Sequence, residues 1–108
     1  MLSEGSTYTD VYKYQISQFG NIRNKNTKQL LYQHLNTTGY KVITLQLDNN
    51  TAKSFRVNRL MALTFHENPN NKPVVDHKDR DTQNNHVDNL RWATYKENAN
   101  NRTNTKKK

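Results

Sequence analysis

The stretch PVVDHKDRDTQNNHVDNLRWATYKEN, residues 73–98, decides the expected fold of the C-terminal half of this 108-residue chain. PVVDH at its start is too short for a helix and predicts a strand, and LRWA at 90–93 predicts a second strand. Between them, KDRDTQNN consists of residues that favour turns. Thr94 and Glu97 have the T-x-x-E spacing of a capping box, which predicts a helix beginning at Tyr95. The expected order is therefore strand, loop, strand, helix.

The preceding part of the chain has the pattern of an antiparallel β-sheet followed by one short helix. VYKYQIS at 11–17 and YKVITLQL at 40–47 alternate polar and apolar residues, FG and TTG mark turns, and DNNT at 48–51 predicts a hairpin. At Asn58, the expected N-cap, apolar residues begin to recur at helical spacing. The prolines of NPNNKP end this helix near His66. The predicted fold class is α+β.

The composition favours a nucleic-acid partner. Seventeen Lys and Arg residues against nine Asp and Glu residues give a formal net charge of +8 and a pI near 9.8, together with six tyrosines. Only 31% of the residues are hydrophobic, so the core is expected to be thin. A basic domain that is merely soluble would have the same composition, and this alternative stays open.

Several classes of protein are excluded by what the sequence lacks. There are no cysteines, which excludes disulfide frameworks and cysteine-based zinc sites and leaves His, Asp, Glu and Asn as metal ligands. No apolar run approaches the roughly 20 residues that span a bilayer, and MLSEGSTYTD at the N-terminus lacks the features of a signal peptide. The protein is therefore expected in the cytoplasm, or wherever its nucleic acid is found.

Four residues have the chemistry of a one-metal phosphodiesterase site. Asp76 and His77 end the first predicted strand, Asn89 enters the second, and Asn98 lies in the first turns of the capped helix. Cutting a phosphodiester with one metal requires oxygen ligands for a hard cation and a neutral base that takes a proton from water. Side chains of the required kinds therefore come from three adjacent elements.

The order of these residues, Asp-His followed by Asn twelve residues after His77 and Asn nine residues later, resembles the HNH endonuclease motif in its H-N-N form. The similarity extends over residues 55–102 and is to the HNH domains of phage and intron-encoded homing endonucleases. YQISQFGNIRNKNTKQLL at 14–31, followed by GYKVITLQL, is similar to a sheet module that precedes such domains. This resemblance implies a phage- or virus-encoded protein that acts in the host cell.

The resemblance also implies a ββα-metal unit with a role for each of the four residues. Asp76 and Asn98 would bind the metal, His77 would be the general base, and Asn89 would brace the loop. Oxygen ligands of this kind suit Mg²⁺ or Mn²⁺. The expected function is a metal-dependent DNA endonuclease that hydrolyses phosphodiester bonds of double-stranded DNA. One active site cuts one strand, so a double-strand break would require a homodimer or two successive nicks.

Basic residues outside this site are expected to contact DNA: Arg23, Lys25, Lys28, Lys41, Arg59 and Arg102. Residues 21–28 are basic with no acid among them, although a solvated surface would have the same composition. Arg102 follows Asn98 by four residues and shares its helix face. The predicted organisation is a flexible N-terminus at 1–10, a DNA-binding sheet module at 11–57, an HNH unit at 58–102 and a basic flexible tail at 103–108.

Two other functions remain open, a non-catalytic DNA-binding protein that keeps the scaffold and an RNA-binding protein. The rival interpretation of DHKDRD is a solvated loop, and Asp79 and Asp81 are assigned to turns in either case. The chain departs from the family pattern at Asn58, where V-H-R is common and V-N-R stands here, and at Arg80, where D-G is common. The second departure removes a glycine from the loop and leaves its turn open.

Overall fold

The computed structural model describes residues 7–103, apart from the side chains of Asn49, Arg102 and Thr103. Two α-helices and three antiparallel sheets follow one another along the chain, which confirms the α+β class. The first sheet contains β1 (Tyr8–Val11), β2 (Tyr14–Ser17) and β3 (Ile22–Asn24). The second contains β4 (His34–Leu35), β5 (Lys41–Gln46) and β6 (Ala52–Arg56), with the 3-10 helix η1 (Asp48–Asn50) between β5 and β6. Helix α1 (Val57–Phe65), strand β7 (Val74–His77), the 3-10 helix η2 (Val87–Asn89), strand β8 (Leu90–Ala93) and helix α2 (Tyr95–Thr103) complete the order, with β7 and β8 paired as the third sheet.

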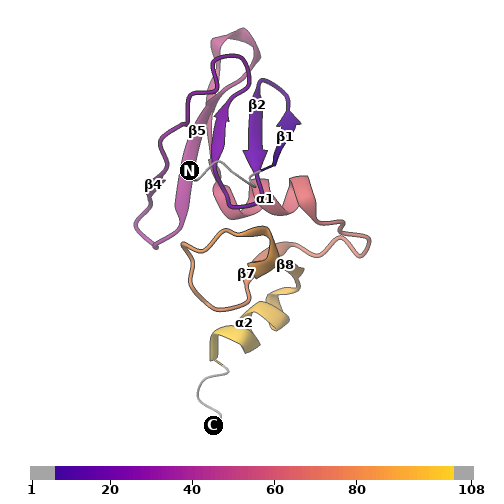
Figure 1. Ribbon diagram of the computed structural model, residues 1–108. Coiled ribbons are helices and arrows are strands. Elements are labelled where there is room, and N and C mark those ends of the chain that lie inside the picture. Colours follow the sequence, from indigo (N-terminus) through magenta and orange to yellow (C-terminus); the bar gives the residue numbers. More distant parts are fainter. Residues whose placement is uncertain (1–6, 104–108) are drawn as a thin grey trace.

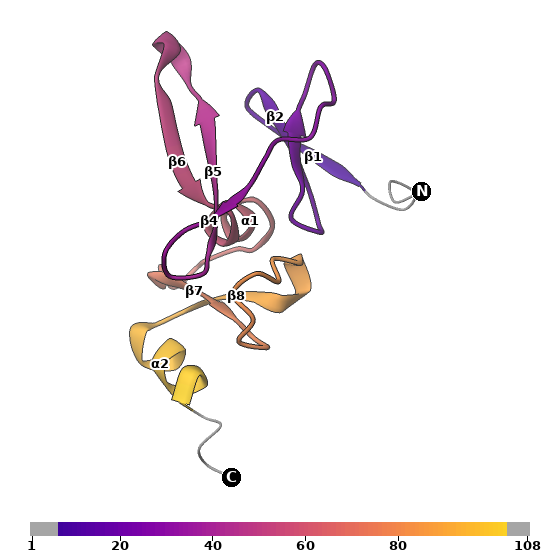
Figure 2. The same cartoon turned by 90° about the vertical axis from the view of Figure 1, so that its left-hand side faces the viewer.

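Helix α1 lies between the two halves of the molecule. Figure 1 shows the two N-terminal sheets on one side of α1, and the β7–β8 hairpin with α2 on the other. In Figure 2 the β5–β6 hairpin and the β1–β2–β3 sheet stand apart above α1, so the helix closes the base of both. Helix α1 contacts β5 and β6 as well as β7 and β8. The second sheet and the C-terminal hairpin are thereby packed on one common element.

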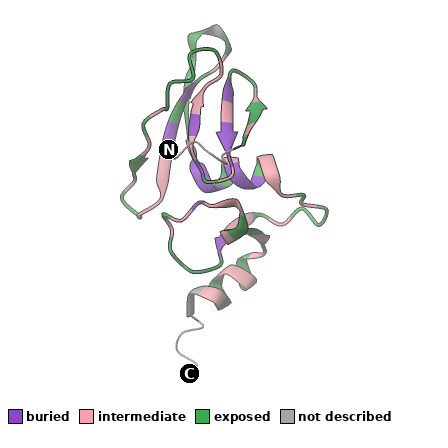
Figure 3. Ribbon diagram, viewed as in Figure 1, coloured by how far each residue is buried: buried purple, intermediate pink, exposed green. Residues whose placement is uncertain are grey.

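The hydrophobic core surrounds α1, as the concentration of buried residues in Figure 3 shows. Its fully or largely buried members are Tyr14, Ile16, Ile22, Ile43, Leu45, Val57, Met61 and Leu90. The buried apolar residues of β2 and β5 alternate along each strand, as the predicted period of two requires, and β2 ends with the buried polar residue Ser17. Burial of each large aliphatic side chain stabilises the fold by about 1.5–3 kcal/mol. The few residues in this core therefore join all three sheets.

The first strands differ from the prediction. VYKYQIS is not one strand, because Tyr12 adopts a φ of 59° and the chain turns back between Val11 and Tyr14, which are paired. Alternation on both sides of this two-residue turn makes the segment look continuous in the sequence. Strand β1 begins at Tyr8, inside the segment predicted to be a flexible N-terminus, while residues 1–6 and the basic tail at 104–108 lie outside the described residues.

Helix α1 begins earlier than predicted. Its N-cap is Arg56 and not Asn58, because Val57 already contributes a fully buried side chain to the helix. Asn58 therefore lies in the first turn, 5% exposed, and its Oδ1 has no hydrogen-bond partner among the described residues. The C-terminal end agrees with the prediction, since the backbone N–H of His66 donates to the carbonyl oxygen of Ala62 at 2.9 Å and closes the helix.

Helix α2 begins with the predicted capping box. The backbone N–H of Thr94 donates to Glu97 Oε1 at 2.9 Å, and the backbone N–H of Glu97 donates to Thr94 Oγ1 at 3.0 Å. The Lys72 ammonium lies 3.1 Å from the same Glu97 carboxylate and ties the helix to the segment before β7. These contacts fix where α2 starts relative to the hairpin.

No helix in the described part of the chain has the length and apolar character needed to cross a membrane.

The capping box predicts an acid-sensitive contribution to stability. The backbone N–H of Thr94, and then Lys72, hold the pKa of Glu97 below its ordinary value of 4.5. The stabilisation is therefore complete above that value and is lost as the pH falls through the lowered pKa. Thermal midpoints measured between about pH 6 and pH 3 should fall less steeply for Glu97→Gln, which still accepts hydrogen bonds, than for the wild type. Equal slopes would contradict this assignment.

Candidate active site

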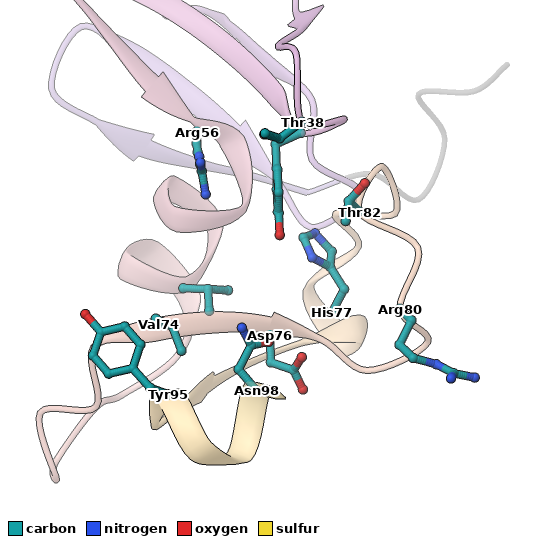
Figure 4. Close-up of a pocket in the computed structure, with 11 residues that line it drawn as sticks. Thr38, Arg56, Val74, Asp76, His77, Arg80, Thr82, Tyr95 and Asn98 are labelled. Atoms are coloured by element: carbon teal, nitrogen blue, oxygen red, sulfur yellow. The ribbon is translucent and has the colours of Figure 1, made fainter. Parts of the chain in front are cut away.

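Strand β7, the start of α2 and residues of the second sheet border one pocket of about 450 Å³. Three of the four predicted site residues line it, namely Asp76, His77 and Asn98 (Figure 4). Adjacent strand residues face opposite sides, and accordingly Asp76 faces α2 while His77 reaches toward the N-terminal sheets. Both side chains reach the pocket because β7 ends at His77. The fourth residue, Asn89, does not line this pocket.

Asp76 is almost completely buried, with 3% of its surface exposed. The Nε of Arg91, its partner across the hairpin, donates to Oδ2 at 2.9 Å. Asn101 Nδ2 lies 3.1 Å from each carboxylate oxygen and 3.1 Å from the carbonyl oxygen of His77. Asn101 was missed in the sequence, although it follows Asn98 at the i, i+3 spacing of one helix face. The carboxylate is therefore held in one orientation by both neighbouring elements.

His77 is 4% exposed and its ring is fixed from two sides. Its Nε2 lies 2.9 Å from Asn85 Oδ1, and the ring of Tyr40 lies with its centroid 5.9 Å away. Because an amide oxygen only accepts hydrogen bonds, Nε2 carries the hydrogen in this pair. The neutral imidazole then has its lone pair on Nδ1, which is the nitrogen that can take a proton. Asn85 was not identified in the sequence, where it is one of two adjacent asparagines in a turn-rich segment.

Asn89 connects both ends of the loop between β7 and η2. Its Oδ1 accepts from the backbone N–H of Asp79 at 3.0 Å, and its Nδ2 donates to Asp79 Oδ1 and to the carbonyl oxygen of Asn84, both at 2.9 Å. Asn84 Nδ2 also donates to Asp79, and this bond, with that from the Asp81 backbone, lowers the pKa of Asp79. Asp79 and Asp81 thus cap turns of the loop, as assigned from the sequence.

Arg80 occupies the loop position at which the family pattern favours glycine. Its φ of 67° lies in the left-handed region, which glycine adopts without strain and other residues adopt at a cost of about 1–2 kcal/mol. The backbone N–H of Arg80 donates to the carbonyl oxygen of His77 at 2.8 Å, so the tight turn is kept. The departure therefore changes the side chain at the border of the pocket and preserves the turn.

The donor set at the pocket fits a hard divalent cation that keeps much of its coordination for water and substrate. Asp76 supplies a carboxylate and Asn98 an amide oxygen, and no cluster of three or more His, Cys, Asp or Glu residues in the described part of the chain offers a closed metal cage. Mg²⁺ is commonly held by one or two carboxylates together with substrate phosphates. The Asp76 carboxylate keeps acceptor capacity beyond the donors from Arg91 and Asn101.

Arg56 is a second residue at the pocket that was not singled out in the sequence. Its guanidinium lies 4.4 Å from the centroid of the Tyr40 ring, and both side chains line the pocket. Figure 4 shows Arg56 on the side of the pocket opposite Asp76 and Asn98. Stacking on an aromatic face orients a guanidinium without neutralising its charge. The pocket therefore combines a carboxylate, a histidine and an oriented cation, which is suited to holding a phosphate oxyanion.

The six residues predicted to contact DNA occupy several parts of the molecule. Arg23 stacks on Tyr8, Lys25 lies 3.6 Å from Asp10, and Lys28 donates to the carbonyl oxygen of Lys25. Lys41 is in β5, away from these three in the sequence. Arg59 donates to the carbonyl oxygen of Pro73 and lies over Trp92. The Arg102 side chain lies outside the described residues. None of the other five residues lines the pocket, so contact between these side chains and DNA stays a prediction.

Two protein-family models match the chain. The model described as HNH endonuclease matches residues 56–100, which include the whole β7–β8 hairpin and most of α2, and the model described as NUMOD4 motif matches residues 4–46. The boundary between the two matched segments falls in the β5–β6 hairpin. The two models thus match separate, non-overlapping segments of the chain.

Individual relatives come from phages and a virus. The DNA endonuclease I-HmuI of Bacillus phage SP01 is 38% identical over 88 residues, which are 82% of this chain and 50% of the relative. A protein of Acanthamoeba polyphaga mimivirus described as an uncharacterized HNH endonuclease is 42% identical over 89 residues, which are 81% of this chain and 22% of the relative. The chain thus spans half or less of the length of these curated relatives.

A solved structure, titled as DNA binding and cleavage by the HNH homing endonuclease I-HmuI, has the same fold over most of this chain. The TM-score is 0.81 at 31% sequence identity, over 93% of this chain and 59% of the other. The likeness therefore includes the N-terminal sheets as well as the C-terminal unit.

Proposed function

Because the chain carries a NUMOD4 motif followed by an HNH endonuclease domain, we propose that it is a metal-dependent endonuclease that hydrolyses phosphodiester bonds of double-stranded DNA. The observation that supports this most is the shared pocket of Asp76, His77 and Asn98. A carboxylate, a neutral imidazole and an amide oxygen around one pocket are the groups that one-metal phosphodiester hydrolysis requires. The I-HmuI structure is titled as one of DNA binding and cleavage, which favours the same substrate here.

In the proposed mechanism Asp76 and Asn98 would hold Mg²⁺ or Mn²⁺. The cation would supply positive charge to neutralise the charge that develops on the phosphate and the leaving oxygen. His77 takes a proton from the attacking water at Nδ1, because Nε2 is engaged with Asn85. Arg91 and Asn101 keep the Asp76 carboxylate in place, and Arg56 binds a phosphate oxygen. Each chain nicks one strand, so double-strand cleavage requires two chains or two successive nicks.

A non-catalytic DNA-binding function is the second candidate, and one observation favours it. The Asp76 carboxylate already accepts hydrogen bonds from Arg91 and Asn101, and Arg91 places a positive charge beside the proposed cation site. A scaffold that had lost its metal would tolerate such an arrangement. In such a protein the guanidinium of Arg91 would be the permanent partner of the Asp76 carboxylate, in place of a metal ion.

Incubation of supercoiled plasmid with the protein separates the two functions. We expect conversion to the nicked form with Mg²⁺ or Mn²⁺ and no conversion with EDTA, because the cation is needed to stabilise charge on the phosphate. Binding of the same plasmid without any metal-dependent nicking would favour the non-catalytic function. The relatives come from phages and a virus, so we propose that the natural substrate is DNA in an infected cell.

The N-terminal sheet module is proposed to bind DNA through the turn at 24–29. Changing both Lys25 and Lys28 to Ala should weaken DNA binding at low salt, because a protein that neutralises fewer phosphates releases fewer counterions when it binds. The slope of log binding constant against log salt concentration should become shallower by about 0.9 for each phosphate that is no longer neutralised. Fluorescence anisotropy with a labelled duplex over a series of salt concentrations measures both quantities.

The matched control for this experiment is Gln29→Ala, a neutral exposed residue of the same turn, whose removal should leave the slope unchanged. If the double lysine variant binds like the wild type at every salt concentration, Lys25 and Lys28 belong to a solvated surface and DNA is bound elsewhere on the protein.

A further inference from the structure

The turn at 17–21 in the N-terminal module packs against the loop that joins β7 and η2 in the C-terminal unit. The turn from Ser17 to Asn21 contacts three consecutive residues, the last two of the loop and the first of η2. Gly20 lies against Asn85, the Phe19 ring meets the His86 ring edge-on with centroids 5.0 Å apart, and the Gln18 carbonyl oxygen accepts from the Val87 backbone N–H at 2.8 Å. The turn thus packs directly on Asn85, the residue that bonds His77.

The turn itself is rigid. Ser17 is fully buried, and its Oγ accepts from the backbone N–H groups of Phe19 and Asn21, both at 3.2 Å. The backbone N–H of Gly20 donates to the Ser17 carbonyl oxygen at 3.1 Å, and Gln33 donates to the Gly20 carbonyl oxygen at 2.8 Å. Gly20 has a φ of 90°, which favours glycine at this position. The turn therefore presents a fixed surface to the loop.

Gly20 leaves just enough room for Asn85. A Cβ atom at Gly20 would lie 3.2 Å from Asn85 Cβ and 3.3 Å from the Asn85 carbonyl oxygen, which is closer than ordinary contact. Asn85 is 5% exposed and is thereby confined between this backbone and the His77 ring. A shift of the turn toward the loop, or a side chain added at Gly20, would therefore press on Asn85, whose Oδ1 bonds His77.

Asn85 is poorly explained as a residue that only stabilises the loop. Its Nδ2 is buried and has no hydrogen-bond partner among the described residues, which makes an amide unfavourable at this position. An apolar side chain of similar size would avoid this burial. The one side-chain hydrogen bond described for Asn85 is that between its Oδ1 and His77 Nε2, and this bond accounts for the amide.

We propose that Asn85 is a positioning residue for His77, and that the turn at 17–21 holds Asn85 in place, so that the N-terminal module is a structural part of the catalytic centre as well as a DNA-binding surface. Asn85 accepts the Nε2 hydrogen and so fixes both the ring orientation and the nitrogen left free to take a proton. This inference rests on the proposed function in one respect, the role of His77 as the base.

Two substitutions at Asn85 test the acceptor directly. Asn85→Leu keeps the approximate volume and removes the acceptor, and should lower the single-turnover nicking rate at saturating protein by about 10- to 100-fold, as misplacement of a catalytic group does. Asn85→Asp keeps an oxygen at the same place and should recover most of the rate. DNA affinity and thermal midpoint should stay near the wild-type values in both variants. Gln83→Ala, exposed in the same loop, is the control and should nick at the wild-type rate.

Two glycine substitutions test whether the turn at 17–21 holds Asn85 in place. Gly20→Ala and Gly39→Ala both place alanine at a φ near 90°, so both carry the same strain in the backbone. The new Cβ at Gly20 presses on Asn85, whereas that at Gly39 meets only Thr82 Oγ1 at an ordinary 3.5 Å. Gly20→Ala should therefore lose much more of the nicking rate than Gly39→Ala at a similar thermal midpoint.

The imidazole ¹⁵N spectrum of His77 gives a readout that does not depend on cleavage. The wild type should show the tautomer with hydrogen on Nε2, and Asn85→Leu and Gly20→Ala should reduce that preference. Wild-type nicking rates and an unchanged His77 spectrum in Asn85→Leu would overturn the inference. If the wild type itself does not nick DNA, the proposed function fails, while the ¹⁵N spectra still decide whether Asn85 and the turn position His77.

Discussion

Replacing His77 with alanine is expected to lower the rate of DNA nicking by about 10²- to 10⁴-fold, the usual contribution of a general base. Among the residues that line the pocket, His77 has the imidazole that can take a proton from water, and with Nε2 bonded to Asn85 the available lone pair is on Nδ1. The effect should fall on the chemical step. Single-turnover nicking of supercoiled plasmid at saturating protein measures it.

The control for this substitution is His34→Ala, which removes an exposed imidazole in β4 that does not line the pocket. His34→Ala should nick at the wild-type rate, and His77→Ala should still bind duplex DNA with nearly wild-type affinity. If His77→Ala keeps most of the nicking rate while its fold is intact, another group activates the water and the assignment of the base is wrong.

Replacing Asp76 with asparagine is expected to cause the second large loss of activity, a fall of about 10²- to 10³-fold at low metal concentration. The change removes the single negative charge proposed to hold the cation. A bound cation stabilises the charge that develops in the transition state by several kcal/mol. Asparagine keeps the shape of the side chain, so Asn101 retains an acceptor. Arg91 is partly exposed and gives up a carboxylate partner at small cost to stability.

Asp81→Asn is the matched control for Asp76→Asn, because Asp81 is an exposed carboxylate in the adjoining loop. It should leave both the nicking rate and the metal dependence unchanged. Isothermal titration of Mn²⁺ into the protein with bound duplex should show weaker binding for Asp76→Asn. Equal Mn²⁺ affinity in wild type and Asp76→Asn would move the cation site away from this carboxylate.

The parts of the fold that can be predicted well are those specified by local chemistry. The capping box at Thr94 and Glu97 places the start of α2, and the short apolar segments before and after the loop place β7 and β8. The predicted start of α1 is two residues late, because the capping preference of Asn58 competes with the apolar character of Val57. In the structure the burial of Val57 decides the outcome.

The part of the site that can be predicted from the sequence is the part whose residues lie in one contiguous segment. Asp76, His77 and Asn98 are close in the sequence and share a hairpin and its following helix, so their spacing carries the information. Tyr40 and Arg56 reach the same pocket from the second sheet, and Gly20 reaches Asn85 from the first. These contacts depend on how the sheets pack on α1, which no local pattern in the sequence expresses.

The most direct test of the proposed mechanism is the rate of plasmid nicking as a function of Mg²⁺ concentration for the wild type, Asp76→Asn and His77→Ala. We expect Asp76→Asn to require a higher metal concentration for half-maximal rate and to be partly rescued by it. We expect His77→Ala to saturate near the wild-type metal concentration at a much lower maximal rate. Metal-independent nicking by the wild type, or the same response in both variants and the wild type, would contradict the mechanism.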